Sequence, residues 1–236
     1  MSAPVPRFRD RRHAEAVDEI KATALRLYAG TGSSGLALRA VAREMGLSAQ
    51  ALYHYFDNRD ALVTALINDG LHAAASAIAR GRDSGGTNRR ERLRGAALAY
   101  RRWAVTEPHV YRLIYSDIIP DYQAPTDKPA VGLLPGLELA KACFESWTPA
   151  QFVALDSALG GPGHLPTGEG FGAIPDSVSA LLARWWAQLH GLMSLEILGR
   201  LQWAQLDPSI VYADTVNALA DEIITLTAPG TTAHPN

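Results

Sequence analysis

The sequence contains only one cysteine, Cys143, among its 236 residues. A single thiol cannot form an internal disulfide or supply a cysteine-based zinc site. Because Cys143 lies in an apolar stretch with helical spacing, we expect it to be a buried structural thiol. No other set of residues has the spacing of metal ligands, so we expect neither a metal nor another cofactor.

Long apolar runs are also missing. No stretch approaches the roughly 18 apolar residues of a membrane-spanning helix. The N-terminus is polar and rich in arginine, and it lacks the apolar region of a secretory signal peptide. We therefore expect a cytoplasmic protein without a membrane partner. With 47% hydrophobic residues, the chain can bury the core of one large domain or of two smaller ones.

An excess of positive charge occurs only near the N-terminus. Residues 1–60 hold 9 Lys and Arg against 7 Asp and Glu, whereas the remainder holds 13 against 17, so balances of +2 and −4 give the net charge of −2. Any nucleic-acid contact is therefore expected from the N-terminal part. Residues 1–10 are rich in proline and arginine and predict a disordered basic arm, which is either a solvated tail or a contact to DNA phosphates.

The sequence shows no alternation of apolar and polar residues with period two, so we expect no β-sheet. Apolar residues instead recur at helical spacing along most of the chain, which predicts an all-α protein. The predicted helices cover 11–29, 38–45, 59–80, 89–106, 108–116, 133–147, 176–203 and 208–226. A short helix that begins at Ser48 lies between the second and third of these, and another short helix is possible near 149–159.

Residues 36–56 predict two short helices joined by a tight turn. Gly46 lets the backbone enter the left-handed region at the turn, and Ser48 can cap the following helix by accepting a hydrogen bond from a free backbone N–H. Such a pair is a helix-turn-helix, whose second helix enters the major groove of DNA. The residues expected between the helices are Leu38, Val41, Ala42, Met45, Leu47 and Leu52.

One face of the second helix stays free because Leu52 takes the inward position. Tyr53, Tyr55 and Phe56 could all be core aromatic residues, but we expect the core for Phe56 and in part for Tyr55, and the helix period favours the outer face for Tyr53. The side chains expected to face outward, toward a major groove, are Ala49, Gln50, Tyr53 and His54.

This segment resembles the DNA-binding domain of the TetR family of transcriptional regulators. The resemblance covers about residues 11–66, without a gap in the motif. It rests on Leu38-Arg39-Ala40-Val41-Ala42, Gly46-Leu47-Ser48, Leu52-Tyr53-His54-Tyr55-Phe56 and Arg59-Asp60-Ala61-Leu62.

The resemblance implies a double-stranded DNA operator as partner, with Tyr53, His54 and Arg59 on phosphates and Arg39 and Gln50 near base edges. Ser48 and Ala49 complete the predicted DNA-binding set. Ala37 stands where the family usually has a threonine that caps the first helix, so a cap worth roughly 1 kcal/mol is missing unless Ser34 replaces it.

A Gly-, Ser- and Asp-rich stretch, residues 81–88, predicts the main domain boundary. It separates the N-terminal part from a larger helical region. The predicted organisation is an arm over 1–10, a helix-turn-helix domain over 11–58, a connecting helix over 59–80, an effector-binding and dimerisation domain over 89–228, and a disordered tail over 229–236.

The C-terminal region carries Trp186, His190 and Gly191 inside one predicted helix. This Trp-x-x-x-His-Gly spacing resembles the C-terminal domain of one TetR branch that is named for these three residues. Positions i and i+4 share a helix face, so Trp186 is expected to stack beside His190. Gly191 costs about 1 kcal/mol of helix stability, which suggests close approach of another helix. His190 is either a buried core histidine or a polar anchor in a ligand pocket, and a metal ligand is the least favoured reading.

Aromatic residues are dense in this region, and family resemblance implies a small-molecule effector cavity lined by some of them. Two stretches without helical pattern, 117–130 and 160–175, could cover its mouth. We expect the effector to be mostly apolar. The candidate lining is Tyr100, Trp103, Tyr111, Tyr115, Trp147, Trp186 and His190.

The function predicted from these features is a ligand-released repressor that acts as a homodimer. Two-fold operators require two DNA-binding domains, and residues 176–199 and 208–226 are expected to form a four-helix bundle with their symmetry mates. Val178, Leu181, Leu182, Leu192 and Leu195 are too many apolar residues for one buried stripe. A bundle enzyme would need a Glu-x-x-His pair or a nucleotide loop, and neither occurs. An architectural DNA binder would need more positive charge.

Overall fold

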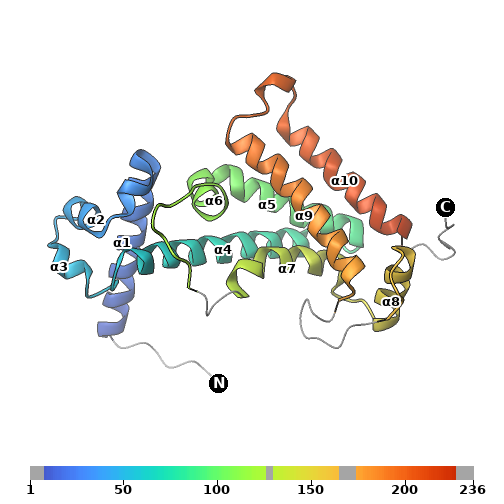
Figure 1. Ribbon diagram of the computed structural model, residues 1–236, viewed down its shortest axis with the longest axis horizontal. Helices are drawn as coiled ribbons and strands as arrows, with labels where there is room; N and C mark the ends of the chain where they lie inside the picture. Colours follow the sequence, from blue (N-terminus) through green and yellow to red (C-terminus); the bar gives the residue numbers. More distant parts are fainter. Residues whose placement is uncertain (1–7, 126–129, 165–173, 227–236) are drawn as a thin grey trace. The chain divides into compact units, whose positions relative to one another are not determined.

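The computed structural model describes residues 8–125, 130–164 and 174–226. Every regular element in these ranges is a helix, which confirms the predicted all-α class (Figure 1). Residues 1–7 of the predicted arm and the predicted tail lie outside the described residues. Residues 8–10 of that arm, in contrast, belong to the first helix. The elements are α1 (Phe8–Thr31), η1 (Gly32–Leu36), α2 (Leu38–Glu44), α3 (Ala49–Leu52), α4 (Arg59–Ser84), α5 (Arg89–Thr106), α6 (Pro108–Tyr115), α7 (Ala130–Phe144), α8 (Pro149–Ala158), α9 (Asp176–Ile197), η3 (Gln202–Ala204) and α10 (Pro208–Leu226).

The chain forms two compact units, and α4 contributes to both. The first unit contains residues 1–72 together with 107–132, and the second contains residues 73–106 together with 133–236. The sequence predicted the N-terminal domain to end near residue 58. The structure adds α6 and the chain after it to that domain, because Leu113 and Ile119 are buried in its hydrophobic core.

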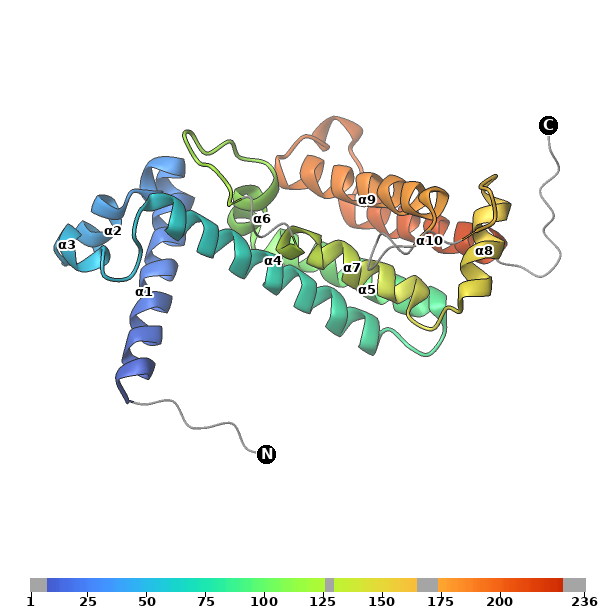
Figure 2. The ribbon, with the colours of Figure 1, turned by 60° about the horizontal axis from the view of Figure 1, so that its bottom comes forward.

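The core of the first unit holds α2 and α3 against α1 and the N-terminal part of α4 (Figure 2). Ile20 and Ala24 from α1 are fully buried there, as are Leu62 and Val63 from α4. Ile20 and Ala24 lie four residues apart, and the buried Leu66 lies four and three residues after Leu62 and Val63, so each helix presents one apolar face to the core. Burial of this face gives the short helices α2 and α3 a rigid base.

Residues 81–84, which the sequence placed in a linker, continue α4 instead. The reason is a close helix crossing. A Cβ atom on Gly81 would lie 2.4 Å from the Ala99 Cβ and 2.4 Å from the Gly95 carbonyl oxygen of α5. Glycine is therefore needed here because the two backbones nearly touch, whereas the composition had suggested a flexible connection.

In the second unit α5 packs against α9 and α10. The Trp185 indole N–H donates to a Glu222 carboxylate oxygen at 2.9 Å, and the Tyr212 hydroxyl donates to the Ala97 carbonyl at 3.1 Å. These bonds join the three helices at buried positions, where an unpaired polar group would be costly.

The ninth helix ends at Ile197, six residues before the predicted end at Trp203. Gly199 adopts a φ of +65°, and the Arg200 N–H donates to the Leu195 carbonyl at 2.7 Å. This is the hydrogen-bond pattern of a glycine-terminated helix, so the backbone itself stops α9.

Among the described helices, α4 alone is long and apolar enough to cross a membrane by length and composition. Half of its apolar window is buried inside the protein. Leu62, Leu66 and Ile78 on this helix are core residues with at most 2% of their surface exposed. Packing of a core helix explains the composition of α4.

Candidate nucleic-acid interface and aromatic sites

The turn between α2 and α3 has the backbone that the sequence predicted. Gly46 has a φ of +67°, in the left-handed region that other residues rarely enter. The Ser48 hydroxyl accepts a hydrogen bond from the Ala51 N–H at 3.2 Å and so caps α3. These two local features fix the direction in which α3 leaves α2.

The apolar side chains between the two helices lie inside the first unit, with one exception. Val41, Ala42 and Leu52 are at most 2% exposed, and Phe56 is also buried. Leu47, which the sequence placed in the corner between the helices, is 43% exposed. Its side chain falls at the turn itself, outside the packed face, so the prediction for Leu47 was wrong.

The residues predicted to read DNA lie on the surface of α2, α3 and the turn after α3. Tyr53 is 46% exposed, which leaves its ring available for contact. Ala49 is partly exposed, and its small side chain allows a close approach at the start of α3. The members of this set with exposed side chains are Arg39, Ser48, Gln50, Tyr53 and His54.

The missing cap before α2 is not replaced. Ala37 occupies the N-cap position without a side-chain hydrogen bond. The Ser34 hydroxyl donates to the Thr31 carbonyl at 2.9 Å, so it bonds to the end of α1 and not to the start of α2. The Ser34 carbonyl instead accepts from the Ala37 N–H at 3.3 Å, which belongs to the η1 turn.

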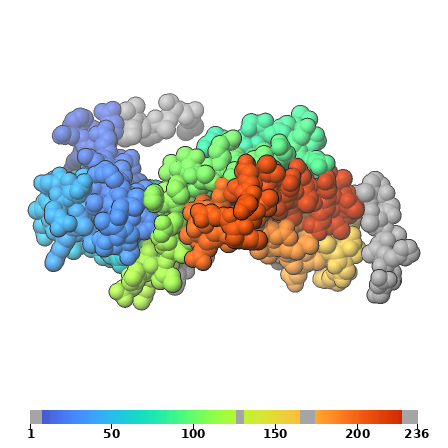
Figure 3. Space-filling view, turned by 90° about the horizontal axis from the view of Figure 1, so that it is seen from above, coloured from blue at the N-terminus to red at the C-terminus, as the bar shows by residue number. Residues whose placement is uncertain are grey.

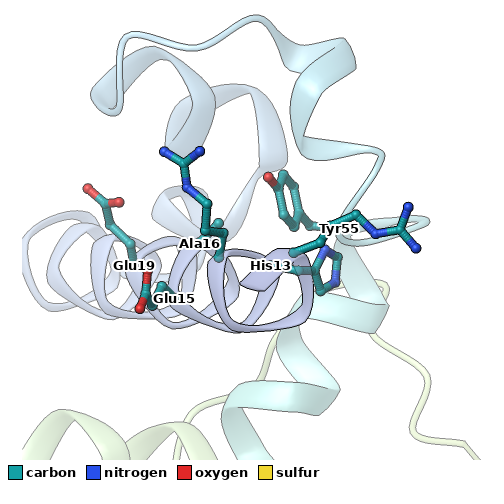
Figure 4. Close-up of a pocket in the computed structure, with 7 residues that line it drawn as sticks. His13, Glu15, Ala16, Glu19 and Tyr55 are labelled. Carbon is teal, nitrogen blue, oxygen red and sulfur yellow. The ribbon is translucent and has the colours of Figure 1, made fainter. Parts of the chain in front are cut away.

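A groove of about 530 Å³ between α1 and the end of the helix-turn-helix was not predicted (Figure 4). His13 stacks on Tyr55 with ring centroids 5.0 Å apart, and both side chains face this groove. Its rim carries both charge signs. The lining is Arg9, Arg12, His13, Glu15, Ala16, Glu19 and Tyr55. The arginine-rich sequence before residue 13 was the available signal, but its composition predicts a disordered arm over residues 1–10.

Arg59, at the start of α4, directs its guanidinium group into the first unit. One N–H donates to the Pro120 carbonyl at 2.8 Å, and another donates to the Ser33 carbonyl at 3.3 Å. Guanidinium has five N–H donors, so these two bonds leave donors for a phosphate. The Asn58 side chain caps α4 by accepting from the Ala61 N–H at 2.8 Å.

The seven candidate pocket residues fall into three groups. In the second unit, the rings of Trp103, Tyr100, Trp186 and His190 stack in series, with centroid separations of 5.9, 5.5 and 5.1 Å and interplanar angles of 20° or less. The last of these contacts is the predicted stacking of Trp186 beside His190. Aromatic rings from α5 and α9 thus stack in one continuous row.

The other three candidates lie elsewhere. Tyr111 and Tyr115 contact each other in the first unit, with ring centroids 5.2 Å apart. Trp147 packs against Phe144 and Phe152 at the end of α7 and the start of α8. The sequence could not separate these groups, because aromatic density alone does not give tertiary neighbours.

Burial changes the titration of two groups in the second unit. Loss of solvent lowers the pKa of His190 to about 4 from its ordinary value of 6.5, so the imidazole is neutral at physiological pH. Burial also raises the pKa of the Cys143 thiol to about 12, which keeps it protonated and unreactive. Among the described residues, no cluster of three or more His, Cys, Asp or Glu side chains could hold a metal ion.

Two family models match the chain at the places where these features lie. The model of bacterial regulatory proteins of the tetR family matches residues 20–66, which contain α2, α3 and the start of α4. The model of the tetracyclin repressor-like C-terminal domain matches residues 93–219. The chain belongs to the TetR family. It is therefore a DNA-binding transcriptional regulator with a helix-turn-helix.

Relatives of this TetR-family protein agree with the assignment. It is 29% identical over 199 residues to an HTH-type transcriptional regulator of Mycobacterium tuberculosis, an alignment that covers 77% of this chain and 80% of that regulator. The crystal structure of the regulatory protein SCO4313 is 31% identical, with a TM-score of 0.71, and covers 91% of this chain and 98% of that one. A TetR family transcription regulator from Marinobacter aquaeolei, at 16% identity and a TM-score of 0.55, shares the fold and covers 93% and 98% of the two chains.

The C-terminal match supports a tetracyclin repressor-like domain for this TetR-family protein. Its description does not name the Trp-His-Gly branch, so that finer assignment stays a prediction. Transcription regulators of this kind are generally not enzymes.

Proposed function

We propose that this TetR-family regulator is a homodimeric repressor that a small, mostly apolar molecule releases from its operator in the cytoplasm. The observation that carries the proposal is the four-ring stack of Trp103, Tyr100, Trp186 and His190 in the second unit. Most of a ligand pocket is apolar, with a few polar groups that fix orientation. The stacked rings supply apolar surface, and the neutral His190 at the end of the row supplies a polar group.

In this proposal the predicted DNA-contact residues of the first unit have three roles. Gln50 on α3 and Arg39 on α2 approach base edges, because a guanidinium can donate to two acceptors of guanine, and an amide can donate to one atom of adenine and accept from another. Tyr53, His54 and Arg59 contact phosphates, which orient the protein without reading sequence. Ser48 and Ala49 allow the start of α3 to lie close to the groove.

Dimerisation is proposed through one exposed face of α9. Val178 and Leu181, two of the apolar residues that the sequence predicted at this interface, are buried within the protomer itself. Leu195 and Leu198 remain 39% and 41% exposed on the other face. At helical spacing with them lie three exposed alanines and Gly191. The complete exposed face is Ala180, Ala183, Ala187, Gly191, Leu195 and Leu198.

Gly191 supports the same proposal. Among the described residues outside its own turn of α9, no atom lies within 4 Å of a Cβ built on this residue. The described part of the protomer therefore offers no partner for the predicted close contact with another helix. Exposed apolar side chains continue beyond α9 into the α9–α10 connection and α10, at Trp203 (83%), Leu206 (61%) and Ile210 (60%). The orange and red surface of this region is uncovered on the face that Figure 3 shows.

Ligand release is tested by operator binding in the presence of a panel of hydrophobic compounds. The expected result is that one class of compound weakens operator affinity at least tenfold, which requires about 1.4 kcal/mol of differential affinity between the two conformations. Trp186→Phe should alter this response while operator affinity without ligand is kept. Trp147→Phe is the matched control, because Trp147 belongs to a separate aromatic cluster. Equal effects of the two substitutions would refute an effector site at the four-ring stack.

The dimer interface is tested by Gly191→Leu and analytical ultracentrifugation. A Cβ at this position meets no atom of a neighbouring described element within 4 Å, so the fold should be kept while the dimer dissociates. Gly136→Leu on α7, where a Cβ also meets nothing, is the control. A wild-type chain that sediments as a monomer at micromolar concentration would refute the dimer.

A further inference from the structure

The chain that follows α6, residues 117–123, is joined to α1 and α4 of the first unit by four hydrogen bonds that involve side chains, the longest running from the Gln123 N–H to an Asp60 carboxylate oxygen at 3.5 Å. The Tyr28 hydroxyl of α1 donates to an Asp117 carboxylate oxygen at 2.5 Å. The Arg59 guanidinium of α4 donates to the Pro120 carbonyl at 2.8 Å. The Tyr122 and Thr64 hydroxyls lie 3.1 Å apart and share a hydrogen bond. The segment therefore touches both helices that support α2 and α3.

Apolar packing accompanies these bonds. Ile119 is 9% exposed and belongs to the same buried cluster as Leu36, Leu52 and Phe56. Its neighbour Ile118 is 91% exposed, so only one side of the segment faces the unit. In Figure 2 this yellow-green segment forms a loop that extends from the end of α6. A segment with no regular structure thus contributes directly to the core under α3.

The bond between Tyr28 and Asp117 is held from both sides. The Tyr28 side chain is buried in the core, and burial together with the adjacent carboxylate raises its pKa, so the hydroxyl keeps its proton and acts as the donor. The Arg112 guanidinium of α6 donates to both Asp117 carboxylate oxygens, the shorter distance being 3.1 Å. A carboxylate between a cation and a hydroxyl makes charge-assisted bonds, which are stronger than neutral ones.

We propose that residues 117–123 are a positioning element of the DNA-reading surface, with Tyr28, Asp117 and Tyr122 as its positioning residues. Through Arg59, which also donates to the Ser33 carbonyl at 3.3 Å, the element reaches the η1 turn directly before α2. It thereby ties α1, the turn before α2 and the start of α4 to one another. Release of the segment lets α2 and α3 turn relative to α4.

The consequence is a separation of specific from random DNA binding. This inference rests on the proposed operator binding. Base contacts need α3 in one orientation on one sequence, whereas phosphates are present in every DNA and carry no sequence information. A protein whose binding-competent orientation is less populated loses apparent affinity in proportion. Loosening the segment should therefore weaken operator binding and leave binding to random DNA almost unchanged.

The test uses Tyr122→Phe and Tyr28→Phe in the full chain, each of which removes one hydroxyl and keeps the ring. The expected result is operator binding about three- to tenfold weaker, with random-DNA binding changed less than twofold. Tyr212→Phe is the matched control, because its hydroxyl bonds to the Ala97 carbonyl in the second unit. It should lower the melting temperature to a similar extent and leave operator affinity unchanged.

Hydrogen exchange without DNA provides a second readout. Amides of residues 49–56 should exchange faster in Tyr122→Phe and in Tyr28→Phe than in wild type, and at the wild-type rate in Tyr212→Phe. Wild-type exchange rates at residues 49–56 in both Tyr122→Phe and Tyr28→Phe would overturn the positioning role. An equal loss of operator and random-DNA binding in these two variants would also overturn it. Failure of the wild-type chain to prefer any operator would instead refute the proposed function, and the exchange experiment would still decide the inference.

Discussion

Gly81 provides a quantitative test of the crossing between α4 and α5. In Gly81→Ala the new methyl carbon would lie 2.4 Å from the Ala99 Cβ and 2.4 Å from the Gly95 carbonyl oxygen. Carbon atoms in van der Waals contact are about 3.5–4.0 Å apart, so the two helices must separate by about 1 Å. Overpacking of this kind costs about 1–3 kcal/mol, and alanine returns up to about 1 kcal/mol through its higher helix propensity.

The expected net loss for Gly81→Ala is about 0–2 kcal/mol, or a fall in melting temperature of up to roughly 8 °C for a chain of this size. The assay is thermal unfolding followed by circular dichroism. Gly136→Ala on α7 is the control, since a Cβ there meets no atom within 4 Å. Its melting temperature should rise by about 2–4 °C. If Gly81→Ala also raised the melting temperature, residues 81–84 would be the flexible linker that the sequence suggested.

Three further predictions concern the DNA-binding helix and the stacked aromatic rings of the second unit. Ser48→Ala removes the α3 cap and should cost about 1 kcal/mol of unfolding free energy, measured by urea denaturation. Tyr53→Ala should weaken operator and random DNA alike, whereas Gln50→Ala should relax sequence preference in a binding-site selection; equal losses on both DNAs for Gln50→Ala would show that it reads no base. The pKa of His190 is about 4 in the folded protein and 6.5 in the unfolded chain. Between pH 6.5 and pH 4, only the unfolded chain therefore binds a proton at this imidazole. Stability should fall as pH drops from 6.5 toward 4, and His190→Phe should reduce this slope in melting temperatures recorded at pH 7, 6 and 5.

The helix-turn-helix could be predicted from the sequence because its determinants are local. Gly46 sets the turn, Ser48 caps the next helix, and Leu52 fixes which side of α3 faces inward, all within seven residues. The stacking of Trp186 and His190 has the same origin, since both lie on one helix face at i and i+4.

Tertiary contacts account for what the sequence did not reveal. Gly81 and Gly95 allow two helices to touch, but glycine in a sequence equally indicates a flexible connection. The 117–123 segment has no periodic pattern, so nothing in its sequence pointed to Tyr28 or Thr64 as its partners. These two contacts join residues that are 58 and 89 positions apart in the sequence, so they depend on the folded arrangement of the first unit.

The most direct test of the central claim is a fluorescence-anisotropy titration of the purified chain with the DNA that flanks its own coding region. The predicted result is saturable binding at least about 10³-fold tighter than to random DNA of equal length and at the same salt concentration. Arg59→Ala should reduce the salt slope by about one unit, because one phosphate contact is lost. Equal affinity for the two DNAs across the flanking region would contradict an operator-specific function.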